Sequence, residues 1–173
     1  MKSLKFFVLV LLCCSCGNSD KTNNLNLEAA TTKKELTLSI DFKTTEPDFF
    51  KIAMNNIVVD EFQKKSIQFS ENVYPTSSFD NITVVFDTNN PSKDILFIPG
   101  NKKNKVIEIQ ALNLNFGNKD LKINSSEIRK NVSINKYVKY DSINNNFVIS
   151  TIDGQLYPVI KLKRGLINRL TKE

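Results

Sequence analysis

Apolar and polar residues alternate with a period of two along much of the chain from residue 35 onward. The clearest case is residues 35–42, in which Leu36, Leu38 and Ile40 fall on one side and polar residues on the other. Such alternation predicts a half-buried strand. Other apolar runs of strand length occur at residues 49–54, 57–59, 67–73, 81–87, 94–99, 105–116, 121–123, 132–140, 147–152 and 156–162.

Residues 105–116 carry a defect in this alternation. Ile107 and Ile109 are in phase, the pattern slips at Ala111, and Leu112 and Leu114 resume it one position later. A slip of one residue within a strand predicts a β-bulge.

The last third of the chain contains two turn signals and two short helical patterns. Asp153-Gly154 joins the runs 147–152 and 156–162, which predicts a hairpin between them. Residues 125–129 predict a single helical turn, and residues 165–173 a short basic tail helix.

Short strands at regular spacing, without a long helix, predict an all-β domain. We expect an antiparallel β-sandwich, jelly-roll-like in form, over residues 35–164, followed by the basic C-terminal tail at 165–173. A β-barrel is the alternative.

The first sixteen residues have a different composition. Lys2 and Lys5 precede an apolar run at residues 6–12, and Cys13-Cys14-Ser15-Cys16 follows it. A charged start, a short apolar stretch and small residues predict an export signal. The apolar run is too short for a helix that crosses a bilayer, which needs about 20 apolar residues.

The cysteine cluster resembles the lipobox of bacterial lipoproteins. In that family a cysteine receives diacylglycerol, becomes the new N-terminus and is acylated again. Cys16, with Ser15 before it and Gly17 after it, is the predicted lipidation site, and Cys14 is the alternative. The resemblance implies a signal peptide at residues 1–15 and a membrane anchor of several acyl chains, which hold a protein durably.

Residues 16–34 then read as the lipidated cysteine and a flexible tether, rich in Asn, Thr, Lys and Ser. Gly17 after the cysteine, in place of the aspartate associated with inner-membrane retention, favours the outer membrane. The sequence leaves open whether the domain faces the periplasm or the cell surface.

Composition excludes several classes of chemistry. The chain has no histidine, and its three cysteines all lie in the signal region. A Ser-His-Asp triad, a cysteine nucleophile and a zinc site of Cys and His are therefore excluded, and we expect no metal or cofactor. The net charge is +6, or +4 after removal of residues 1–15, with bases and acids interspersed, which is not a nucleic-acid-binding pattern.

Two kinds of loop have candidate chemistry. Residues 87–94 offer several oxygen-bearing side chains that suit Ca²⁺, although Asp and Asn also close turns. The basic clusters at 102–105 and 161–164 suit anionic lipid or glycan phosphate, although solvated surface charge explains them equally.

The run 132–141 suggests a ligand site. If it is one continuous strand, Val132, Ile134, Val138 and Tyr140 face the core. Tyr137 is then exposed between Asn135 and Lys139. An apolar ring flanked by hydrogen-bonding groups suits a sugar, so these three residues are the predicted ligand-binding site.

Together these patterns predict a lipid-anchored cell-envelope lipoprotein, not an enzyme, whose β-domain binds a glycan or a partner protein. One alternative is a structural subunit of an envelope complex. Another is a glycan hydrolase with two carboxylates, such as Asp41 and Glu108.

Overall fold

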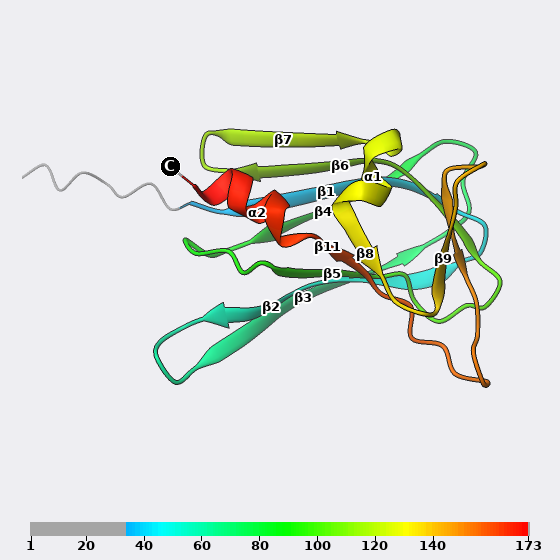
Figure 1. Cartoon of the computed structure of the whole chain (residues 1–173), viewed down its shortest axis with the longest axis horizontal. Helices are drawn as coiled ribbons and strands as arrows, with labels where there is room; N and C mark the ends of the chain where they lie inside the picture. The colour runs from blue at the N-terminus through cyan, green and yellow to red at the C-terminus, as the bar shows by residue number, and fades with distance from the viewer. Residues whose placement is uncertain (1–33, 173) are drawn as a thin grey trace, which may run out of the picture. The chain divides into compact units, whose positions relative to one another are not determined.

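The computed structural model describes residues 34–172. The predicted signal peptide, Cys14, Cys16 and the tether up to residue 33 lie outside the described residues, so these remain predictions. Residues 34–172 form two antiparallel β-sheets that share one core (Figure 1). The prediction of an antiparallel β-sandwich is therefore confirmed, and the barrel alternative is wrong. Neither described helix has the length and apolar character required to span a membrane.

The first sheet contains six strands. Their order is β4 (Asp80–Phe86), β1 (Leu36–Thr44), β6 (Val106–Phe116), β10 (Asn146–Ile149) and β9 (Val138–Asp141), and β7 (Lys119–Asn124) also pairs with β6. β10 pairs with the start of β6 and β7 with its second half, so the two strands share one edge of β6.

The second sheet contains five strands. Their order is β3 (Lys64–Val73), β2 (Asp48–Val58), β5 (Asp94–Ile98), β11 (Ile160–Leu162) and β8 (Val132–Ile134). The helices are α1 (Ser125–Asn131), which leads into β8, and α2 (Arg164–Thr171), which follows β11.

Alternation produces the core. Every second residue of β1, from Leu36 to Thr44, is buried, and the residues between them are half-buried on the outer face. The rings of Phe42 and Phe50 lie 5.1 Å apart, and those of Phe50 and Phe97 lie 5.2 Å apart, so a chain of rings joins the two sheets.

The predicted bulge in β6 is confirmed. Asp41 of β1 is opposite Ala111, but the next residue, Phe42, is opposite Ile109, which leaves Gln110 as the extra residue. A bulge returns the side chains that follow it to the same face of the sheet. The apolar residues on both sides of the slip are therefore buried.

The predicted hairpin between residues 147–152 and 156–162 is wrong in its pairing. Asp153 and Gly154 do form a tight turn, with φ of 50° and 73°, and Ile152 pairs with Gln155 across it. Beyond that turn the chain leaves the first sheet, because β10 belongs to it while β11 pairs with β5 and β8 in the second. Residues 156–159 form the crossover.

The C-terminal tail belongs to the domain. Leu166, Ile167 and Leu170 of α2 are buried in the common core, and α2 contacts β6 and β7. The predicted boundary at residue 164 therefore cuts through a packed unit.

The sandwich has two ends with different contents (Figure 1). One end, which we call the near end, contains the start of β1, the β2–β3 turn, the loop 87–93 and α2. At the opposite end, the far end, lie the loop 99–105 and the turn at 153–154. The N–H of Lys34 donates to Asn89 Oδ1 (3.1 Å), which fixes the beginning of the described chain at the near end.

Candidate functional site

An apolar depression with a volume of about 570 Å³ lies at the far end. Three segments line it: the start of β2, the end of β5 with the loop after it, and the crossover. Its residues are Asp48, Phe49, Lys51, Ile98, Gly100, Asn101, Leu156, Tyr157, Pro158 and Val159. Phe49 and Tyr157 are 48% and 66% exposed, so two aromatic rings are presented to solvent. We call this depression the aromatic groove.

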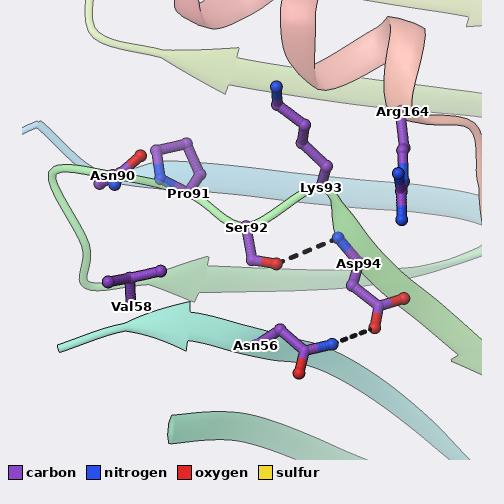
Figure 2. Close-up of a pocket in the computed structure, with 8 residues that line it drawn as sticks. All are labelled: Asn56, Val58, Asn90, Pro91, Ser92, Lys93, Asp94 and Arg164. Carbon is purple, nitrogen blue, oxygen red and sulfur yellow. Dashed lines mark hydrogen bonds between the residues drawn. The ribbon is translucent and has the colours of Figure 1, made fainter. Parts of the chain in front are cut away.

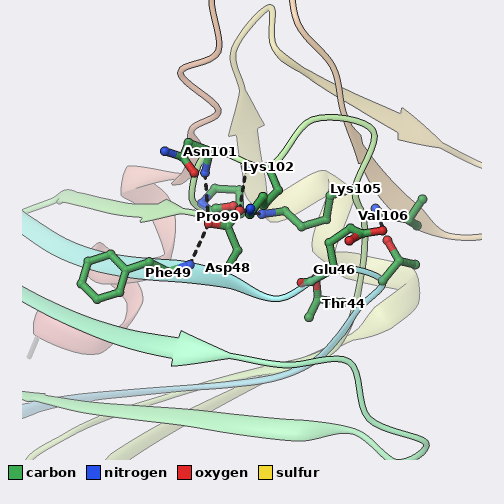
Figure 3. Close-up of polar contacts among 10 residues, drawn as sticks. Thr44, Glu46, Asp48, Phe49, Pro99, Asn101, Lys102, Lys105 and Val106 are labelled. Atoms are coloured by element: carbon green, nitrogen blue, oxygen red, sulfur yellow. Dashed lines mark hydrogen bonds and ion pairs between the residues drawn. The ribbon is translucent and has the colours of Figure 1, made fainter.

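The Asp48 carboxylate holds one wall of the aromatic groove in place (Figure 3). Its Oδ1 accepts from the N–H of Phe49 (2.7 Å) and of Asn101 (3.3 Å), and its Oδ2 accepts from the N–H of Lys102 (2.8 Å). One side chain of β2 thereby binds the backbone of the loop that follows β5.

Lys105 binds the same Asp48 carboxylate from the interior of the sandwich. Its side chain is fully buried, and its ammonium donates to Asp48 Oδ2 and to the carbonyl oxygen of Pro99. Its Nζ also lies 5.0 Å from the ring centroid of Phe50. Burial of a charge is tolerated because a partner of opposite sign and a carbonyl compensate for the lost water.

Both pKa values of this pair are shifted downward. Burial, the largest influence, acts to raise the pKa of Asp48, but hydrogen bonds from Lys105, Lys102 and Phe49 outweigh it and leave that pKa below its usual value. Burial lowers the pKa of Lys105, and its hydrogen bond to Asp48 offsets this only in part. The pair acts as a structural clamp between the start of β2 and the loop after β5.

The clamp requires a glycine at position 100. Gly100 has a φ of +71°, a conformation that side chains disfavour. A Cβ at this position would lie 2.3 Å from Asp48 Cγ. The loop can therefore approach the carboxylate only because this residue lacks a side chain.

Asn135 holds the opposite wall. Its Nδ2 donates to the carbonyl oxygen of Tyr157 (2.6 Å), and its Oδ1 accepts from the N–H of Val159 (3.2 Å) and of Tyr137 (3.3 Å). The Tyr137 ring packs edge-on against the Tyr157 ring, with centroids 6.0 Å apart, and its hydroxyl donates to Gln155 Oε1 (3.3 Å).

The expectation that Tyr137 is exposed is wrong. It is 5% exposed, because residues 132–141 do not form one strand. β8 ends at Ile134 in the second sheet and β9 begins at Val138 in the first, and the turn between them carries Tyr137 inward. Asn135 and Tyr137 therefore support the wall of the aromatic groove from behind.

Lys139, the third predicted ligand residue, is exposed on β9 and does not line the groove. Tyr157, and not Tyr137, is the exposed tyrosine that lines the groove. Alternation in residues 156–162 could have revealed it, because Pro158, Ile160 and Leu162 face inward there and Tyr157 falls in the opposite phase.

The loop 87–94, predicted as a possible calcium site, lies by a second, smaller pocket of about 300 Å³ at the near end (Figure 2). Its oxygen atoms are used to shape the loop: Thr88 Oγ1 accepts from the N–H of Asn90, and Ser92 Oγ accepts from the N–H of Asp94. Within residues 34–172, no three side chains of His, Cys, Asp or Glu are grouped to hold a metal ion.

The two basic clusters have different environments. Lys105, in the first, is buried in the clamp and is not a solvated surface charge. In the second, Lys161 forms an ion pair with Asp94, which also accepts from Asn56 Nδ2 (2.7 Å). The hydrogen bond from Lys161 is the main cause that lowers the pKa of Asp94.

The two carboxylates proposed for a hydrolase lie on neighbouring strands. Glu108 of β6 is opposite Lys43 of β1, and Asp41 is opposite Ala111. Asp41 Oδ1 accepts from Asn81 Nδ2 (2.6 Å), and neither carboxylate lines the aromatic groove.

Comparisons with known proteins give no match: no family model fits the sequence, and no curated protein or solved structure is significantly similar to the chain.

Proposed function

We propose that this protein is a lipid-anchored lipoprotein of the bacterial outer membrane whose β-sandwich binds a glycan, without catalysis, in the aromatic groove. The observation that carries the binding role is the pair of exposed rings, Phe49 and Tyr157, in one groove. A ring face packs against the C–H face of a sugar, while nearby donors and acceptors bind its hydroxyls. Lys51 and Asn101 line the same groove and supply such donors and acceptors.

The rigidity of the groove supports this role. The clamp of Asp48 and Lys105 holds one wall and Asn135 holds the other, so few residues of the groove have to become ordered when a ligand binds. A preformed site loses less conformational entropy when it binds a ligand.

Binding is tested with an array of bacterial cell-wall and surface glycans, using the wild type and Tyr157→Ala. We expect affinity to fall about tenfold or more, as for an aromatic residue at the centre of an interface. Phe62→Ala is the matched control, because Phe62 is an exposed ring at the near end. Equal binding by wild type and Tyr157→Ala would remove the aromatic groove as the glycan site.

The anchor rests on the resemblance to lipoproteins at Cys16, and it is tested separately. Mass spectrometry of the mature N-terminal peptide is expected to show an acylated Cys16, and protease accessibility on intact cells would report the face of the membrane. An unmodified peptide that begins further downstream would contradict the anchor.

A second candidate function, a structural subunit of an envelope complex, is favoured by β3. This ten-residue strand is at the edge of the second sheet, with β2 as its neighbour among the described strands, and most of its residues are exposed. Such an edge can pair with a strand of another protein. Co-purification of a stoichiometric partner, together with unchanged glycan binding by Tyr157→Ala, would favour this function.

A further inference from the structure

The turn between β2 and β3 lies at the near end (Figure 1) and carries exposed apolar side chains. Val58 and Val59 are each 54% exposed, and Phe62 is 93% exposed. We call these three residues the hairpin tip. Scattered exposed apolar residues are ordinary, but an aromatic and two aliphatic side chains within five positions form a local patch.

The turn that carries the hairpin tip is well ordered by its own hydrogen bonds. Asp60 Oδ1 accepts from the N–H of Phe62 and of Gln63 (2.8 Å each), and the N–H of Val59 donates to the carbonyl oxygen of Gln63 (3.0 Å). Phe62 is therefore held outside the fold by a closed turn, and the Asp60 carboxylate is engaged by backbone donors.

Basic side chains stand behind the hairpin tip. Lys64 and Lys65 open β3 immediately after the turn, and both are exposed. Val58 also lines the near-end pocket with Lys93 and Arg164 (Figure 2). Asp60 and Glu61 carry opposing charges within the turn. An apolar projection backed by lysine and arginine is the chemistry that meets an anionic membrane surface.

The position of the hairpin tip points to the same partner. The described chain begins at Lys34, which is fixed to Asn89 in the loop beside this pocket. Cys16 is 18 positions before Lys34, so the chain that leads from the predicted anchor enters the sandwich at the near end. The aromatic groove lies at the other end.

We propose that the hairpin tip inserts into the interface of the lipid bilayer to which Cys16 is anchored. This inference rests on the proposed lipid anchor. Phe62, Val58 and Val59 enter the boundary between headgroups and acyl chains, and the basic side chains face anionic headgroups. Insertion gives the anchored domain a fixed orientation, with the aromatic groove directed away from the membrane.

The test uses tryptophan as a reporter, because the chain contains none. Phe62→Trp is made in the full-length protein, which is purified in its processed form and reconstituted in vesicles of phosphatidylethanolamine and phosphatidylglycerol. We expect a blue shift of the emission and a loss of intensity when brominated lipids replace the unlabelled ones. Ile143→Trp is the control, because Ile143 is 91% exposed. It belongs to the turn between β9 and β10, which lies at the far end (Figure 1), so its emission should stay that of a solvated indole.

Two failures can be told apart. If the N-terminal peptide is acylated but tryptophan at 62 is quenched no more than tryptophan at 143, the membrane role of the hairpin tip is wrong and the anchor stands. If the peptide carries no acyl chain, the anchor itself is wrong, and the inference falls with it. Both variants change exposed side chains, and thermal unfolding would confirm that each retains the wild-type fold.

Discussion

Asp48 and Lys105, which are 57 positions apart in the sequence, form a buried ion pair that joins the start of β2 to the residue before β6. The same carboxylate accepts three backbone hydrogen bonds, two of them from the loop after β5. One side chain therefore couples the stability of the sandwich to the shape of the aromatic groove.

Asp48→Asn is expected to destabilise the fold strongly. It leaves the Lys105 ammonium buried without an opposite charge, and breaking such a pair costs about 3–5 kcal/mol. Chemical denaturation measures this free energy. In the double variant Asp48→Asn/Lys105→Met no buried charge remains, so a large part of the loss should be recovered. A double variant less stable than Asp48→Asn would contradict the clamp.

The clamp also predicts how stability depends on pH. Because the folded-state pKa of Asp48 is lowered, its contribution is complete above its unfolded pKa, near 3.8, and is lost as the pH falls through the lower folded value. The stability difference between wild type and Asp48→Asn should therefore shrink below about pH 4. Denaturation curves from pH 7 to pH 2 test this, and a constant difference would contradict it. Asp94, whose pKa is also lowered, contributes to the pH dependence of stability in both proteins, so this contribution cancels in the comparison.

Gly100→Ala is expected to be far more harmful than Gly154→Ala. The two glycines have nearly the same φ, +71° and +73°, so both substitutions have a similar backbone cost. A Cβ at residue 154 meets nothing within 4 Å, whereas one at residue 100 collides with Asp48. Overpacking of this kind adds about 1–3 kcal/mol. Thermal or chemical unfolding of the two variants measures the gap, and equal losses would show that the loop does not need its close approach to Asp48.

Asn135→Ala should loosen the crossover that forms the second wall. It removes the side-chain acceptor of the Val159 N–H and the donor to the Tyr157 carbonyl, each worth about 1 kcal/mol. Hydrogen exchange at Val159 should become faster, and glycan affinity should fall. Asn144→Ala, which changes an exposed turn, is the control. Unchanged protection at Val159 would show that Asn135 does not hold this wall.

The local pattern of apolar and polar residues was sufficient to predict which face of a strand is buried. The alternation of Leu36, Leu38 and Ile40 predicted which side of β1 is buried. The slip at Ala111 predicted the bulge, in which Gln110 is the extra residue of β6. Both are properties of a single strand with period two, so neighbouring residues specify them.

Pairing and burial over long separations could not be predicted in this way. Nothing near Lys105 marks it as buried, because its partner Asp48 comes from a different strand. The alternation of residues 132–141 predicts the wrong environment for Tyr137, because the chain changes sheets between β8 and β9 and tertiary pairing determines that change. For the same reason Asp153-Gly154 marked a turn correctly but not the strands that follow it.

Photo-crosslinking in intact cells would show whether the aromatic groove binds a glycan in the cell envelope. A photoreactive amino acid replaces Asn101, which is exposed and lines the same groove as Tyr157. We predict a carbohydrate adduct at this position that disappears when Tyr157→Ala is added, while the same probe at Ile143 yields none. Absence of a carbohydrate adduct at residue 101, or an adduct that persists without the Tyr157 ring, would contradict glycan binding in the aromatic groove.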